Sequence, residues 1–202
     1  MSRTMDRRLF LSLPTAAIAW TITGCTTPPP VTPRFAEIGF RNQPQYRFRV
    51  SSAEVANVFQ QTMAPPFVEH RAPVPPAEAA ARWLRDRVVA SGGEHTLRLV
   101  VKEASIRETA LERTQGVRGL FTTDQSHRYD AVLDVDLEIR NARGLRDGVV
   151  TSRSERSRTV AETISLAGRE RVWFEMVEAM GQDMNSELDR GIRSTLVRFL
   201  VL

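Results

Sequence analysis

One run of eleven residues constrains the fold of this chain more than any other part of its sequence. Within residues 129–139, apolar side chains take nearly every second position, and acidic side chains take most of the positions between them. Side chains alternate between the two faces of a β-strand, so this spacing predicts a strand with one buried face and one solvated face. Such a strand needs neighbours in a sheet and a layer that covers its apolar face. The apolar set is Tyr129, Ala131, Leu133, Val135, Leu137 and Ile139.

Three further segments have strand patterns. Residues 45–59 begin with Tyr46, Phe48 and Val50 alternating with arginines, and residues 95–106 repeat such an alternation. Residues 149–161 are polar on both faces, which is typical of an edge strand that charge protects from further pairing.

Two segments predict helices. Residues 76–91 carry Pro76 in the first turn, a stripe of alanines and leucine, and the pair Gly92-Gly93 as a stop signal. From about residue 166 to the C-terminus, apolar side chains recur every four residues, and Ser165 precedes them as an N-cap. The elements follow the order β-α-β-β-β-α and predict an α+β domain, in which two helices cover one face of a four-stranded antiparallel sheet.

The only cysteine, Cys25, stands at the end of an apolar N-terminal segment. Three arginines precede this segment and Gly24 provides a small residue before the cysteine, as in an export signal. The segment is too short and too interrupted for a spanning helix, which needs roughly 18 consecutive apolar residues. The sequence Ile22-Thr23-Gly24-Cys25 resembles a bacterial lipobox. This resemblance implies cleavage after residue 24 and lipidation of Cys25, with palmitate among the expected acyl chains.

The alternative is a plain signal peptide with an incidental cysteine, and Arg7-Arg8 also resembles the twin-arginine export pattern. Well-studied Gram-negative lipoproteins use an aspartate after the acylated cysteine for inner-membrane retention, whereas this chain has Thr26. The expected organisation is a signal peptide (Sec or twin-arginine) over residues 1–24, a proline-rich tether over 25–44, and one periplasmic domain over 45–202. We therefore expect a lipid-anchored protein on the periplasmic face of the cell envelope, more at the outer than at the inner membrane.

The basic composition does not indicate nucleic-acid binding. The formal charge is +4, but removal of residues 1–24 would take away three arginines and one aspartate and leave +2. So small an excess does not predict a basic stripe for nucleic acid. Because Lys102 is the only lysine, contacts with anions, including anionic lipid, would be made mainly by guanidinium groups.

The sequence offers little for catalysis. His70, His95 and His127 are scattered, and none stands near a cysteine or carboxylate at metal-ligand spacing. Ser126 and His127 are neighbours on a strand, where successive side chains point apart, so they do not form a catalytic pair in this interpretation. We expect no catalytic residues, no cofactor and no metal.

Acidic side chains form a row on the solvated face of the strand at residues 129–139. Asp134, Asp136 and Glu138 share this face. The row has two interpretations: a solvated face balanced by arginines on neighbouring strands, or a site for a divalent cation.

The connection between the second and third strands, residues 109–126, is longer than an ordinary hairpin loop. It carries Val117, Leu120 and Phe121 beside Arg118, and two glycines, Gly116 and Gly119, permit tight turning. Apolar side chains at an exposed loop tip indicate a partner, either protein or lipid. These four residues are therefore the candidate partner-binding residues; alternatively, the loop folds back over the end of a helix.

The element order and the lipobox resemble small periplasmic lipoproteins such as the lipopolysaccharide-assembly lipoprotein that partners an outer-membrane barrel. The sequence around residues 68–70, 121–125, 128–129 and 157–160 resembles a family of uncharacterised lipoproteins of Gram-negative bacteria. These resemblances imply a non-catalytic envelope lipoprotein that docks on an envelope protein and assists assembly or transport. Two other functions stay open: a binder of lipid or lipopolysaccharide, and an envelope hydrolase, which would need a pocket with convergent polar groups.

Overall fold

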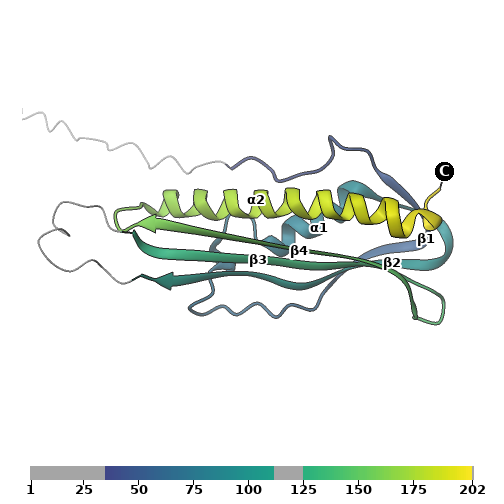
Figure 1. The fold of residues 1–202 in the computed structure, drawn as a ribbon, viewed down its shortest axis with the longest axis horizontal. Coiled ribbons are helices and arrows are strands. Elements are labelled where there is room, and N and C mark those ends of the chain that lie inside the picture. Colours follow the sequence, from purple (N-terminus) through teal and green to yellow (C-terminus); the bar gives the residue numbers. More distant parts are fainter. Residues whose placement is uncertain (1–34, 112–124, 202) are drawn as a thin grey trace, which may run out of the picture. The chain divides into compact units, whose positions relative to one another are not determined.

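Four strands and two helices form the framework of the residues that the computed structural model describes, 35–111 and 125–201 (Figure 1). The strands form one sheet in the order β1-β2-β3-β4, and both helices lie on the same face of it. The expected α+β class and the element order β-α-β-β-β-α are confirmed. The elements are β1 (Tyr46–Asn57), α1 (Pro76–Arg87), β2 (Val88–Ala110), β3 (Gln125–Arg140), β4 (Arg146–Ala161) and α2 (Leu166–Gly191).

Strand β3 has the buried face that its sequence predicts. Its inward side chains, from Tyr129 to Ile139, are at most 1% exposed, and the strand pairs antiparallel with both β2 and β4. Complete burial of one leucine or isoleucine side chain contributes about 1.5–3 kcal/mol. Strand β3 is therefore the centre of the core, with the helices packed over it.

The pairing of β1 with β2 differs from the expected antiparallel sheet. These two strands are parallel, with Tyr46 beside Val88 and Asn57 beside Val101. The reason lies in their connection, because helix α1 returns the chain along the sheet and the next strand starts where β1 started. The antiparallel prediction was wrong for this one pair and holds for the other two.

Helix α1 is shorter, and β2 longer, than the sequence analysis predicts. Helix α1 ends at Arg87, and the chain enters β2 directly at Val88. The β-branched pair Val88-Val89 favours a strand where its backbone can pair with the start of β1. Gly92 and Gly93, expected to stop the helix, instead lie within β2 with φ of 86° and 126°, where the register between β1 and β2 shifts.

Helix α2 begins as predicted and ends before the C-terminus. Ser165 caps its first turn, since its hydroxyl accepts a hydrogen bond from the backbone N–H of Gly168 at 3.1 Å. The α-helix ends at Gly191 and continues into a π-helical turn, Ile192–Leu196, and a 3-10 turn, Val197–Phe199. The buried stripe of α2 comprises Trp173, Met176, Val177, Met180, Met184 and Leu188, so the methionine-rich face fills the core.

Residues 35–44, which the sequence analysis places in the tether, pack on the domain. Ile38 and Phe40 are buried, and both lie against Gly181 of α2. The ring of Phe35 lies beside that of Phe174, with 5.0 Å between their centroids. The described part of the chain therefore begins in contact with the N-terminal half of α2.

Candidate docking site

Strand β1 is an edge strand, and residues at the C-terminal end of the chain cover its first part. Leu200 forms an antiparallel bridge with Phe48, and the backbone N–H of Val201 donates to the carbonyl oxygen of Arg47 at 2.8 Å. The turns that follow α2 bring these residues to the start of β1 (Figure 1). This contact demonstrates that the edge of β1 accepts an antiparallel segment.

The second part of β1, Ser51–Asn57, has no strand on its outer side among residues 35–111 and 125–201. We call this segment the open edge. It holds a single charged side chain, Glu54, and Arg98 of β2 pairs with that carboxylate at 2.9 Å. Val55 is 38% exposed. Unpaired N–H and C=O groups on such an edge form a template for a strand from another chain.

Exposed apolar side chains follow the open edge. The side-chain oxygen of Asn57 accepts a hydrogen bond from the N–H of Phe59 at 3.1 Å, a local turn that ends β1. Val58 is 60% exposed and Met63 is 69% exposed. Single exposed apolar residues are common on protein surfaces, but Val58 directly follows the open edge and Met63 stands five residues after Val58. They enlarge the apolar surface that a partner on the open edge would cover.

A recess of about 350 Å³ lies at the start of β1, and Arg49, Gly93, His95, Arg198 and Phe199 line it together with Glu94. The shift of register in β2 creates one wall, because Phe48 pairs with Ala90 whereas Val50 already pairs with His95. A Cβ atom at Gly93 would lie 2.7 Å from the carbonyl oxygen of Arg49, and the φ of Gly93 is 126°. Only glycine meets both demands, so this wall depends on Gly93.

Hydrogen bonds fix the side chains of the recess. A guanidinium nitrogen of Arg49 donates to the carbonyl oxygen of Arg198, and Arg198 donates to the carbonyl oxygen of Asp147 at 2.6 Å. The Nε2 atom of His95 lies 3.0 Å from a carboxylate oxygen of Asp147. The guanidinium of Arg198 also lies 4.7 Å from the centre of the Phe199 ring. One cationic group, that of Arg198, is thus held over an aromatic ring, and that of Arg49 is fixed beside the backbone of Arg198.

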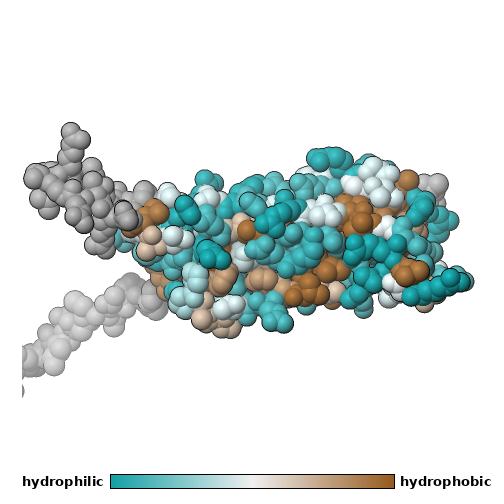
Figure 2. All heavy atoms as spheres, turned by 60° about the horizontal axis from the view of Figure 1, so that its bottom comes forward, coloured by the Kyte–Doolittle hydropathy of each residue, from teal (hydrophilic) through white to brown (hydrophobic). Residues whose placement is uncertain are grey.

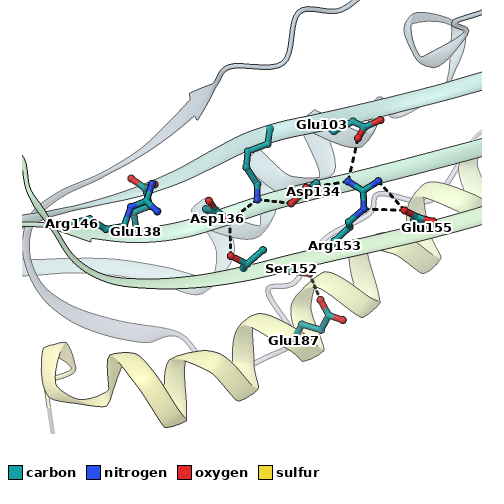
Figure 3. Close-up of polar contacts among 11 residues, drawn as sticks. Glu103, Asp134, Asp136, Glu138, Arg146, Ser152, Arg153, Glu155 and Glu187 are labelled. Carbon is teal, nitrogen blue, oxygen red and sulfur yellow. Dashed lines mark hydrogen bonds and ion pairs between the residues drawn. The ribbon is translucent and has the colours of Figure 1, made fainter.

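The predicted acidic row lies on the sheet face opposite the helices and is neutralised by cations (Figure 3). Lys102 lies 2.8 Å from both Asp134 and Asp136, and Arg153 lies 3.1 Å from Asp134. Glu138 is only 1% exposed, with Arg140 at 2.7 Å and Arg146 on its other oxygen. The arginines lie partly on β3 itself, so the row is balanced within its own strand as well as by its neighbours.

This sheet face is a polar lattice of paired acidic and basic side chains. Figure 2 shows a surface that is mostly hydrophilic with small apolar patches. Burial lowers the pKa of Lys102, but hydrogen bonds to Asp134 and Asp136 outweigh it and raise that pKa overall. In residues 35–111 and 125–201, no three His, Cys, Asp or Glu side chains are arranged to hold a metal ion.

The histidines occupy separate places. His95 lines the recess. The hydroxyl of Ser126 lies 2.8 Å from Nδ1 of His127, so these two side chains are in contact, contrary to the prediction that they point apart. The nearby carboxylate of Asp130 is engaged by Arg128 at 2.8 Å and not by His127. The described residues therefore supply no carboxylate to orient His127 as a general base.

The predicted site residues lie outside the described part of the chain. These are the lipidation residue Cys25 and the loop residues Val117, Arg118, Leu120 and Phe121. No helix within residues 35–111 and 125–201 combines the length and the apolar character that are needed to cross a bilayer.

The open edge and the recess were not found by sequence reasoning. The signal for the edge was present, because a β-α-β order favours parallel pairing, and the last strands then continue the sheet on one side only. The signal for the recess was Gly92-Gly93, which equally marks a helix stop or a bulge.

Comparisons with known proteins returned solved structures only: no family model and no curated protein matches the chain. The rare lipoprotein B from Shewanella oneidensis is 13% identical, with 69% of this chain and 92% of that chain covered and a TM-score of 0.36. A minor lipoprotein from Acinetobacter baumannii is 11% identical, with 69% and 92% covered and a TM-score of 0.37. Similarity at this level identifies neither the family nor the function of the chain.

Proposed function

We propose that this chain is a non-catalytic, lipid-anchored envelope protein that docks on another envelope protein through the open edge of β1. The anchor is the acylated Cys25 that the lipobox resemblance implies. The occupant of the edge is an extended segment of the partner, running antiparallel to Ser51–Asn57. One observation carries the proposal: the same strand already accepts Leu200 and Val201 as an antiparallel segment, directly before the part that stays unpaired.

The packing of the domain favours docking over the alternative of lipid binding. An acyl chain would need an apolar groove between the helices and the sheet. In the described residues this layer is filled by large side chains, among them Trp83, Trp173 and Phe48, each at most 1% exposed. Opening a groove there would break close-packed contacts throughout the core, which costs several kcal/mol.

The loop of residues 109–126 is proposed as a second contact with the partner. Replacement of Leu120 and Phe121 with serine should then abolish capture of the partner and leave the thermal midpoint unchanged. A large loss of stability with intact capture would assign the loop to the core of the domain instead.

The open edge can be tested by site-specific cross-linking in intact cells. A photoreactive phenylalanine analogue at position 55 should give an adduct with an envelope protein, and peptide mapping should place the linkage in an extended segment. The matched control is the same analogue at Thr159, an exposed position on β4, the opposite edge strand. Equal adducts from both positions, or adducts from position 159 alone, would contradict docking at β1.

A substitution provides an independent test of the edge. Val55→Lys places a charge where a partner strand would lie, which is how natural sheets prevent pairing at their edges. The position is exposed, so we expect stability to change by less than about 0.5 kcal/mol. Adduct formation from a probe at Val58 should fall at least fivefold, whereas Thr159→Lys should leave it unchanged.

The anchor has its own test. Cells supplied with a palmitate analogue should label the native chain and not the Cys25→Ala variant. Label retained by the alanine variant would remove the anchor from the proposal while leaving the edge contact to be judged by cross-linking.

A further inference from the structure

The recess and the open edge form one continuous surface. Arg49 lines the recess and stands two residues before Ser51, the first residue of the open edge. The hydroxyl of Ser51 donates to the carbonyl oxygen of His95, another lining residue, at 3.0 Å. A segment paired with the open edge and running antiparallel to β1 would therefore pass toward the recess with its C-terminal part.

The recess carries more positive than negative charge. Its lining includes two guanidinium groups, those of Arg49 and Arg198, and one carboxylate, that of Glu94. The carboxylate of Asp147 lies behind His95 and is engaged there, with a second hydrogen bond from the amide of Asn141 at 3.1 Å. The two arginines thus face the recess without a carboxylate bound to either of them in the described residues.

Both guanidinium groups are positioned and keep unused donors. Each spends one terminal nitrogen on a backbone carbonyl, which holds it in place. A guanidinium has five N–H groups in a planar fork, so most donors of Arg49 and Arg198 stay available for an oxyanion. Both positive side chains line the same recess, so an anion bound there would be attracted by both of them.

The shape of the recess distinguishes among anions. Phe199 gives its lining an apolar part, which suits the methylene groups of an acidic amino-acid side chain. Its volume of about 350 Å³ has room for a residue and its backbone. Because the recess continues the open edge, the anion that reaches it most directly is one carried by the segment on that edge.

We propose that the recess binds a carboxylate carried by the C-terminal part of the partner's edge-pairing segment, either as an acidic side chain or as a terminal carboxylate. This inference rests on the proposed docking at the open edge and adds the chemistry of the partner: an extended segment that ends in negative charge. The recess fixes the direction and register of that segment. A carboxylate at the N-terminal end of the segment would lie beside Val58, at the far end of β1, and could not reach the recess.

The test uses two labelled peptides and the full acylated chain in detergent. Both peptides alternate valine and threonine over eight residues; one carries two glutamates at its C-terminal end, and the other carries glutamines there. Fluorescence anisotropy should show the glutamate peptide binding at least tenfold more tightly. Higher concentrations of sodium chloride should reduce this preference, because salt screens the attraction between the glutamates and the exposed arginines of the recess.

Matched variants assign the preference to the recess. In Arg49→Gln/Arg198→Gln the preference should fall below about twofold, whereas Arg143→Gln, at an exposed position of the β3–β4 hairpin, should leave it intact. The variant Arg49→Lys keeps the charge and should retain part of the preference. Thermal melts of each variant establish that the fold is present before affinities are compared.

The outcomes separate this inference from the proposed function. Equal binding of both peptides would overturn the carboxylate proposal and leave docking at the edge standing. No binding of either peptide, together with no adduct from position 55, would overturn both. Binding of phosphatidylglycerol vesicles that is lost in Arg49→Gln/Arg198→Gln, without any preference between the peptides, would make the recess a headgroup site and would also overturn the proposal.

Discussion

The two edges of the sheet are built in opposite ways. Strand β4 carries four charged side chains between Arg153 and Arg158, and helix α2 covers part of it. The hydroxyl of Ser152 reaches Glu187 of α2 at 2.5 Å, and Arg156 pairs with Asp183 of the same helix. The open edge of β1 has small side chains, a single charge, and no described element on its outer side.

This difference indicates that the chain restricts strand pairing to one place. Charged side chains are a usual protection of sheet edges, and β4 has them, with Ser152 and Arg156 also engaged by α2. The start of β1 is protected as well, by Leu200 and Val201. The segment Ser51–Asn57 follows this guarded start and is itself left unprotected, which confines a partner to a defined length of strand.

The largest loss of stability is expected where α2 packs against β4. A Cβ atom at Gly191 would overlap with Cγ1 of Val150, so Gly191→Ala must push the helix away from the strand. Such overpacking costs about 3 kcal/mol, and chemical denaturation should show that loss in the free energy of unfolding. The double variant Gly191→Ala/Val150→Ala should recover part of it, because the second change removes the atoms that clash. Purely additive losses would show that α2 and β4 do not press together here.

A smaller loss of stability is expected from high pH at Tyr129, on the face of the sheet that the helices cover. Burial and a hydrogen bond to Glu108 raise the pKa of Tyr129 to about 12, against an opposing contribution from Arg169. The folded state holds this proton more tightly than the unfolded chain, so the resulting stability is complete below pH 10 and is lost as pH rises toward 12. The loss at pH 12 should be about 2 kcal/mol. In Tyr129→Phe the decline between pH 10 and 12 should be smaller by that amount; an unchanged decline would contradict the assignment.

The smallest effect is expected on the open edge itself. Glu54→Gln removes a partly exposed ion pair with Arg98, and exposed pairs contribute about 0.5 kcal/mol. Thermal melts at low and high salt should differ less for this variant than for the native chain. A loss of 2 kcal/mol or more would mean that the edge is a structural element and not a free surface.

The sequence predicted those parts of the fold that depend on local periodicity. The alternation from Tyr129 to Ile139 and the cap at Ser165 needed no tertiary information, and both hold in the structure. Gly92-Gly93 was misjudged because a helix stop and a strand bulge both require positive φ, and only the partner strand decides between them. The parallel pairing of β1 was missed because alternation specifies a face and not a direction.

The candidate site depended on what no local pattern reveals. The edge of β1 is open because β1 is the outermost strand of the sheet. The recess brings together Arg49 and Arg198, which are 149 positions apart in the sequence. Their proximity follows from the turns after α2, which return the chain to β1. Charge and exposure at single positions could not have placed them together.

The contact between Phe35 and Phe174 limits the distance between the domain and the proposed anchor at Cys25. Ten residue steps separate Cys25 from Phe35, and an extended chain covers at most about 36 Å over that distance. With Cys25 as the proposed anchor, Phe35 and the helix α2 that it contacts can lie no farther than that from the anchored residue. The proposed partner would accordingly be one that stands at the same membrane surface.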